Sequence, residues 1–192
     1  YTFTLRENVK FHNGKAVTAD DVIYSVKRCA GLLDDKDPEV VVESALSVIS
    51  AVEKVGEDTI VISLSEPNTE LLGFLTCFII PEDYTNQSSA PVGTGPYKFV
   101  SYEPLTSFVV ERFDDYYGEQ PYLENVTFKI CASNDAAFME LLSGGIDVFP
   151  YLTADQAAQL TDAYKVEVSG MALVQALFVN AAVAPFDKLE VR

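Results

Sequence analysis

The stretch NVTFKICASNDAAFMELLSGGIDVF, residues 125–149, carries the clearest sign of the fold class. Residues 125–131 alternate apolar and polar side chains, as a half-buried strand does. Asn134 can cap the helix that follows, and Gly144 with Gly145 can end it. Residues 146–149 then have the composition of a short strand. A strand, a helix and a second strand in succession are typical of a βαβ unit with parallel strands.

The segments on either side continue this mixture of strands and helices. Towards the C-terminus we expect a helix over 154–163, capped by Thr153, and strands over 165–168 and 173–180. Towards the N-terminus we expect strands over 97–102 and 107–113. The pattern as a whole predicts a mixed α/β class.

The first ninety residues predict a smaller α/β arrangement. Residues 1–5 alternate as a strand, and a helix is expected from Thr18, with Asp21 in its first turn, to Gly31. Residues 39–50 have helical length and are expected to form a helix, and 51–64 are typical of a hairpin that turns at 56–58. Asn68 is expected to cap a short helix, and residues 82–92 form a polar loop where a boundary can fall.

Composition and charge exclude several classes of function. The chain of 192 residues has 13 Lys and Arg against 29 Asp and Glu, a formal net charge of −16. Such a chain repels phosphate backbones and anionic headgroups, so we expect no nucleic-acid partner and no basic membrane-binding patch. The apolar runs are far too short to span a bilayer. Tyr1 and Arg192 both lie inside apparent elements, so we expect the chain to be a piece of a longer protein.

The residues that could carry chemistry form no catalytic or metal-binding constellation. His12 is the single histidine and is expected in a turn or at the surface, which leaves no base for a nucleophile and no multi-histidine metal site. The acidic run at 34–37 lacks the spacing of a calcium loop. Gly93-Thr94-Gly95 lacks the lysine of a phosphate loop. We therefore expect a binding protein without catalytic residues, cofactor or resident metal.

The cysteines and the tyrosine-rich loop leave alternatives open. Cys29, Cys77 and Cys131 cannot all pair, and we expect buried free thiols, with one disulfide as the alternative. Tyrosines in the loop after residue 113 can line a ligand surface or anchor the loop to its own domain, and anchoring is the favoured interpretation. These tyrosines are Tyr116, Tyr117 and Tyr122.

A series of sequence blocks, in one order along nearly the whole chain, resembles the family 5 extracellular solute-binding proteins. These are the oligopeptide, dipeptide and nickel receptors of ABC importers. The blocks are Tyr1–Arg6, Val9–Lys15, Thr18–Arg28, Gly93–Phe99, Glu111–Gly118, Pro121–Leu123, Val126–Ile130, Glu140–Asp147, Phe178–Asn180 and Ala184–Arg192.

The resemblance implies most of the first lobe of a two-lobed, type II periplasmic-binding-protein-like fold with a mixed sheet. Residues 1–90 would form an accessory α/β subdomain of this lobe. Residues 91–192 would contribute its central-sheet part and run to the hinge, with the second lobe absent. Gly93 and Gly95 would permit a backbone turn that a Cβ would obstruct.

The resemblance also implies where a ligand would bind. Family members often carry aromatic residues on the strand leading to Asn180, but here this stretch is Val174-Gln175-Ala176-Leu177-Phe178. Gln175 can hydrogen-bond a peptide backbone, and Leu177 would share its face of the strand. These two residues are the predicted ligand-binding residues, with an ordinary structural strand as the alternative.

The function that the resemblance implies is capture of short peptides between two lobes and delivery to ABC permease subunits. Nickel chelate, haem or sugar ligands within the same family are alternatives, as is a signalling or adhesion receptor without transport. The protein would be a monomer outside the bacterial membrane, in the periplasm or held by a lipid anchor beyond this sequence. With one lobe only, the chain is expected to bind peptide weakly or undetectably.

Overall fold

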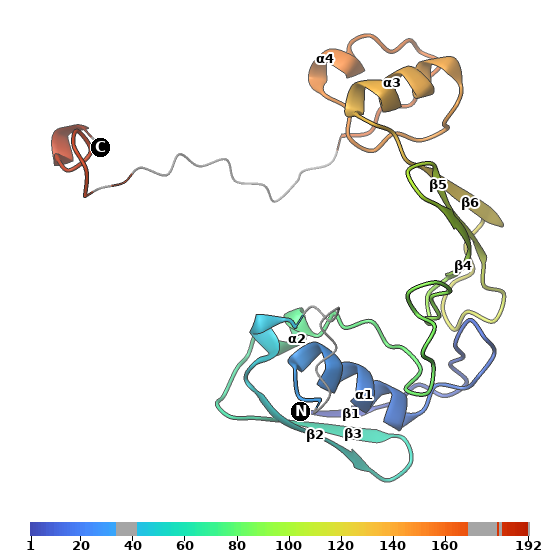
Figure 1. The fold of residues 1–192 in the computed structure, drawn as a ribbon, viewed down its shortest axis with the longest axis vertical. Coiled ribbons are helices and arrows are strands. Elements are labelled where there is room, and N and C mark those ends of the chain that lie inside the picture. The colour runs from blue at the N-terminus through green and yellow to red at the C-terminus, as the bar shows by residue number, and fades with distance from the viewer. Residues whose placement is uncertain (34–41, 169–179, 181, 192) are drawn as a thin grey trace. The chain divides into compact units, whose positions relative to one another are not determined.

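A computed structural model describes residues 1–33, 42–168, 180 and 182–191 (Figure 1). The chain divides into two compact units, Tyr1–Ser133 and Asn134–Arg192, which are described separately. Among the described residues, no helix is long and apolar enough to cross a membrane.

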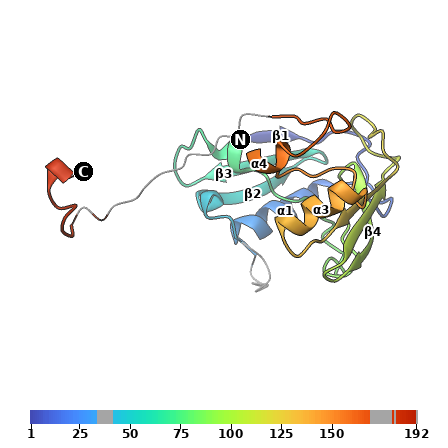
Figure 2. The same cartoon turned by 90° about the horizontal axis from the view of Figure 1, so that it is seen from above.

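The first unit begins with an antiparallel sheet covered by a helix. The strands β1 (Thr2–Thr4), β3 (Thr59–Leu64) and β2 (Ile49–Val55) lie in the order β1-β3-β2. Helix α1 (Ala19–Ala30) lies against β2 and β3, as Figures 1 and 2 show. The buried core between them consists of Ala19, Val26, Ala30, Leu46, Ile49, Val52, Ile60, Ile62 and Leu71.

The predicted helix after Thr18 is confirmed, and its ends show why it forms there. The Thr18 hydroxyl accepts a hydrogen bond from the Asp21 amide, and the Asp21 carboxylate accepts one from the Thr18 amide, which completes a capping box. Gly31 ends the helix in the left-handed conformation, with φ of 69°. Both signals were local, so the sequence alone was sufficient to predict this helix.

The predicted helix over 39–50 is wrong where the structure describes it. Ser44–Leu46 form only a 3₁₀ turn, η1, and β2 begins at Ile49. The apolar residues of this segment fit either period, and pairing of β2 with β3 places Ile49 and Val52 in the core. The hairpin prediction is confirmed, with Gly56 at φ of 80° in its turn. The short helix α2 (Leu71–Phe74) follows, but Asn68 does not cap it.

A second antiparallel sheet completes the first unit. Its strands β4 (Tyr97–Glu103), β5 (Ser107–Arg112) and β6 (Asn125–Lys129) pair in sequence order. All strand pairs among residues 1–33 and 42–168 are antiparallel, so the prediction of parallel βαβ pairing is wrong for the described strands. The mixed α/β class itself is confirmed.

The second unit contains α3 (Asn134–Ser143), α4 (Ala154–Ala157) and the 3₁₀ turn η2 (Leu189–Val191). Gly144, at φ of 75°, follows α3 as predicted. Gln156 connects the two helices, because its side-chain amide donates to Asp135 Oδ1 at 3.2 Å. The predicted strands over 146–149 and 165–168 do not form, and α4 is shorter than expected.

The predicted division into 1–90 and 91–192 concerns the subdomains of a two-lobed receptor and stays a prediction. The two sheets lie on either side of residue 90, whereas the boundary between the compact units lies at 133/134.

Candidate functional site

The two predicted ligand-binding residues lie outside the described part of the chain. Gln175 and Leu177 fall within residues 169–179, as does most of the predicted strand over 173–180. Their role therefore stays a prediction based on sequence resemblance.

His12 connects the N-terminal segment to the turn before β4. Its Nδ1 accepts a hydrogen bond from the Gly93 amide at 3.2 Å, and its Nε2 lies 3.0 Å from Gly95 O. Since Nδ1 accepts, the neutral ring carries its proton on Nε2 and donates to Gly95 O. The ring also packs edge-to-face on Phe113, with centroids 5.1 Å apart. His12 is thus a half-buried structural link.

The prediction that His12 lies in a turn is confirmed, but its role as a link was missed by the sequence analysis. Its partners are backbone groups 81 and 83 positions along the chain, and no side-chain pattern announces them. The prediction that a Cβ would be obstructed at Gly93 and Gly95 is also wrong. A Cβ at Gly93 would lie 3.7 Å from His12 Cε1, which is ordinary van der Waals contact, and one at Gly95 would lie 3.9 Å from Tyr97 O.

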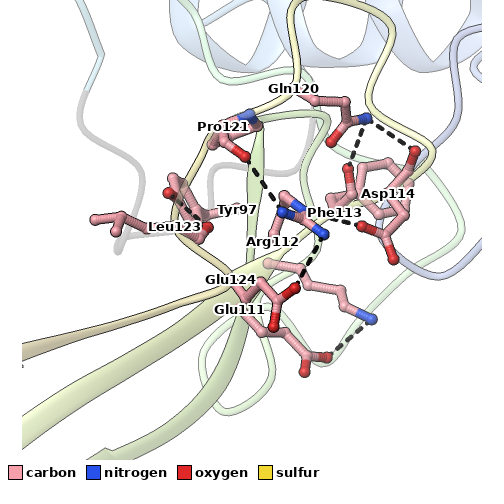
Figure 3. A network of polar contacts seen from close by, with 10 residues as sticks. Tyr97, Glu111, Arg112, Phe113, Asp114, Gln120, Pro121, Leu123 and Glu124 are labelled. Carbon is pink, nitrogen blue, oxygen red and sulfur yellow. Dashed lines mark hydrogen bonds and ion pairs between the residues drawn. The ribbon is translucent and has the colours of Figure 1, made fainter.

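A polar network centred on Arg112 orders the loop between β5 and β6 (Figure 3). Arg112 Nε donates to Asp114 Oδ1 at 3.0 Å, Nη1 donates to Pro121 O at 3.4 Å, and Nη2 lies 3.6 Å from Glu124 Oε1. The Gln120 side-chain amide donates to Asp114 O at 2.8 Å. The hydrogen bond from the Arg112 guanidinium to Asp114 raises the pKa of Arg112. The guanidinium of Arg112 is therefore engaged by residues of this loop.

The three tyrosines of the same loop differ in the contacts that they make. The rings of Tyr116 and Tyr117 lie 4.7 Å apart, and the Arg6 guanidinium lies 5.4 Å from the Tyr117 centroid. Gly118 allows this arrangement, because a Cβ there would lie 2.7 Å from Tyr116 Cε1. Tyr117 thus contacts a residue outside the loop, as the anchoring interpretation expects, whereas the ring of Tyr116 contacts Tyr117 within the loop and Tyr122 is 93% exposed.

Within residues 1–33 and 42–168, and at the few described positions beyond, no group of three or more His, Cys, Asp or Glu side chains could hold a metal ion. The acidic run at 34–37 lies outside the described residues. The described residues thus provide two antiparallel sheets, and polar contacts hold the loops between their strands in place.

Comparison with known proteins supplies the family. The model of "Bacterial extracellular solute-binding proteins, family 5 Middle" matches residues 1–192. The oligopeptide-binding protein AppA of Bacillus subtilis is 30% identical over 166 residues, covering 78% of this chain and 29% of AppA. Heme-binding protein A of Haemophilus influenzae is 29% identical over 225 residues, covering 100% of this chain and 40% of that protein.

Solved structures agree with the sequence matches. The structure of AppA in complex with a nonapeptide has a TM-score of 0.68 and 27% identity, covering 76% of this chain and 31% of AppA. AgaA of A. tumefaciens R10, in complex with agropinic acid, has a TM-score of 0.71 and 32% identity, covering 82% of this chain and 33% of AgaA. The chain spans 29% and 40% of the two curated relatives. It belongs to the bacterial extracellular solute-binding proteins of family 5, as its sequence blocks predicted.

Proposed function

We propose that this chain forms most of the first lobe of an extracytoplasmic receptor, which captures short peptides and delivers them to the permease of an ABC importer. The observation that carries the proposal is the family match over all 192 residues, together with the likeness to AppA, whose structure holds a nonapeptide. The relatives that match are binding proteins, which supports a role without catalysis.

Peptide capture by such a receptor rests on closure of two lobes around an extended ligand. The backbone of the peptide can be satisfied by main-chain and amide groups of the cleft. Closure expels water, so each hydrogen bond forms in a less polar medium and strengthens. Binding then shifts the equilibrium from open towards closed lobes.

Gln175 and Leu177 are the residues of this chain that we propose contact the ligand. In the full-length receptor, Gln175→Ala should weaken peptide binding by about 3- to 10-fold, the loss expected for one hydrogen bond. Gln159→Ala is the matched control, because Gln159 is exposed in the second unit and its amide donates only locally, to Asp155 O. Equal affinities of the two variants would contradict the assignment of Gln175.

Native mass spectrometry of the full-length receptor, purified without refolding, tests the proposed function. A distribution of added masses that match short peptides would support peptide capture and give the range of lengths. A single added mass that matches a metal chelate, haem or sugar would contradict the peptide proposal. A bare protein that binds no added peptide would also contradict it and would favour a signalling or adhesion receptor.

The hydrogen bonds made by the His12 ring argue against nickel as the ligand of this protein. A nickel site in proteins usually uses imidazole nitrogens. His12 is the single histidine of the chain, and both of its ring nitrogens are engaged with backbone groups of Gly93 and Gly95. A bound nickel ion would therefore need a chelator that arrives with it, or side chains from outside this chain.

Location and partners follow from the same proposal. Family members are extracytoplasmic solute-binding proteins. For this protein we propose a monomer, free in the periplasm or held at the cell surface by a lipid anchor beyond this sequence, with permease subunits as partners.

A further inference from the structure

The segment after α2 runs antiparallel to α1 and is hydrogen-bonded along one of its faces. The Glu82 amide donates to Asp21 Oδ1 at 3.0 Å. Four residues further along the helix, Ser25 Oγ accepts a hydrogen bond from the Ile80 amide at 3.0 Å and lies 3.2 Å from Ile80 O. Residues four apart share one face of a helix, so this face is aligned with the segment in a defined register.

Continuing this register brings two cysteines together. Cys29 is the next residue on the helix face of Asp21 and Ser25, and Cys77 lies three residues before Ile80 in the segment, within about one residue of the position that the register places opposite Cys29. Both side chains are partly buried against the same core cluster. Cys29 is among the groups that raise the pKa of Cys77, which makes the two thiols neighbours. Two independent features, the register and the shared burial, therefore place this pair.

The thiols are free in the structure, and their surroundings would protect a bond between them. Burial, followed by the hydrogen bond with Cys29, raises the pKa of Cys77 to about 12. A thiol with a raised pKa is a poor leaving group, so a disulfide between these two sulfurs would be reduced only slowly by other thiols. Family 5 members work outside the cytoplasm, where disulfides form and persist.

We propose that Cys29 and Cys77 are a disulfide site that joins the C-terminal end of α1 to the segment after α2. In the step, each thiol loses its proton, one sulfur–sulfur bond forms, and the two electrons reduce a disulfide oxidant RS–SR to two RSH. The bond would close a loop of roughly 50 residues, which restricts the unfolded chain. Cys131 follows β6, in the other sheet, and is not a member of the pair.

Refolding in a buffer of reduced and oxidised glutathione tests the site, because every thiol is accessible before the chain folds. The expected product has lost two hydrogen atoms in mass, and its non-reduced peptide map joins the peptides that contain Cys29 and Cys77. The melting temperature of this product should exceed that of the reduced chain by about 5–10 °C. The Cys131→Ser variant should behave in the same way, since it keeps the pair.

Single variants in the Cys131→Ser background are the controls. Cys29→Ser and Cys77→Ser should each show neither the mass loss nor the difference in melting temperature between oxidising and reducing buffers. Folded wild-type chain with both thiols still open to alkylation after denaturation would overturn the proposal. A peptide map that joins Cys131 to either residue, or a product with only glutathione adducts, would overturn it too.

Discussion

At the scale of single residues, protonation of the His12 ring removes the hydrogen bond that Nδ1 accepts from Gly93. Burial lowers the pKa of His12, its bond to Gly95 O opposes this, and the charge of Lys98 lowers the pKa further. The folded state therefore binds a proton less readily than the unfolded chain, whose histidine titrates near the ordinary value of 6.5. This contribution to stability is present above pH 6.5 and is lost as the pH falls from 6.5 through the lowered folded pKa.

The prediction for His12 compares the wild type with His12→Gln, whose amide can form hydrogen bonds without titrating in this range. Between pH 7.5 and about 5, the melting temperature of the wild type should fall further than that of the variant. Both proteins have the same carboxylates, so the difference between their melting temperatures removes the effect of carboxylate titration. If the melting temperatures of the two proteins fell equally across this pH range, protonation of His12 would not be linked to stability.

Gly118 and Gly73 should respond in opposite ways to an added methyl group. At Gly118 a Cβ would lie 2.7 Å from Cε1 of the Tyr116 ring, so Gly118→Ala should lower the free energy of unfolding by about 1–3 kcal/mol. At Gly73, within α2, a Cβ meets nothing within 4 Å, so Gly73→Ala should raise it by about 0.5–1 kcal/mol. Urea unfolding measures both. A neutral Gly118→Ala would show that the loop yields to the methyl group.

At the scale of elements, Thr18 determines where α1 begins. Thr18→Ala should lower the free energy of unfolding by about 1 kcal/mol, because the Asp21 amide loses its acceptor. Thr18→Ser keeps a hydroxyl and should lower the free energy of unfolding by only a few tenths of a kcal/mol. Equilibrium denaturation of the two variants separates the hydrogen bond from other effects of the side chain. Equal losses would show that the threonine methyl group, rather than the cap, matters.

Elements with local signals were predictable from the sequence, and elements that depend on distant partners were not. The capping box at Thr18 and the left-handed glycines, Gly31 and Gly144, gave the ends of α1 and α3. Residues 39–50 were expected to be helical, because only pairing of β2 with β3 decides between the two periods. The strand expected at 146–149 failed for the same reason, since no neighbouring strand pairs with it in the structure described here.

The distinction between local signals and distant partners also applies to the candidate site. The family and its expected cleft followed from ordered sequence blocks, so they needed no knowledge of contacts. The link from His12 to Gly93 and Gly95, and the nearness of Cys29 to Cys77, arise from tertiary contacts and carried no signal in sequence spacing.

At the scale of the whole molecule, the length of the chain sets an expectation for binding. The chain spans about a third of AppA and of AgaA, so it would hold only part of the cleft that we propose lies between two lobes. Isothermal titration of the 192-residue chain with short peptides should give a Kd above about 1 mM, against micromolar or tighter binding by the full-length receptor. Micromolar binding by the 192-residue chain would show that a single lobe suffices.

The order β1-β3-β2 in the first sheet has a consequence for the sequence of folding events. The turn at 56–58 lets β2 and β3 meet early, whereas β1 must close a loop of more than 50 residues to pair Thr2 with Val61. We therefore expect the hairpin to form first and to act as the template on which β1 is added late. In stopped-flow experiments Gly56→Ala should mainly slow refolding, whereas Phe3→Ala should mainly accelerate unfolding. As the chain is synthesised, β1 would wait for the hairpin to emerge before it could join the sheet.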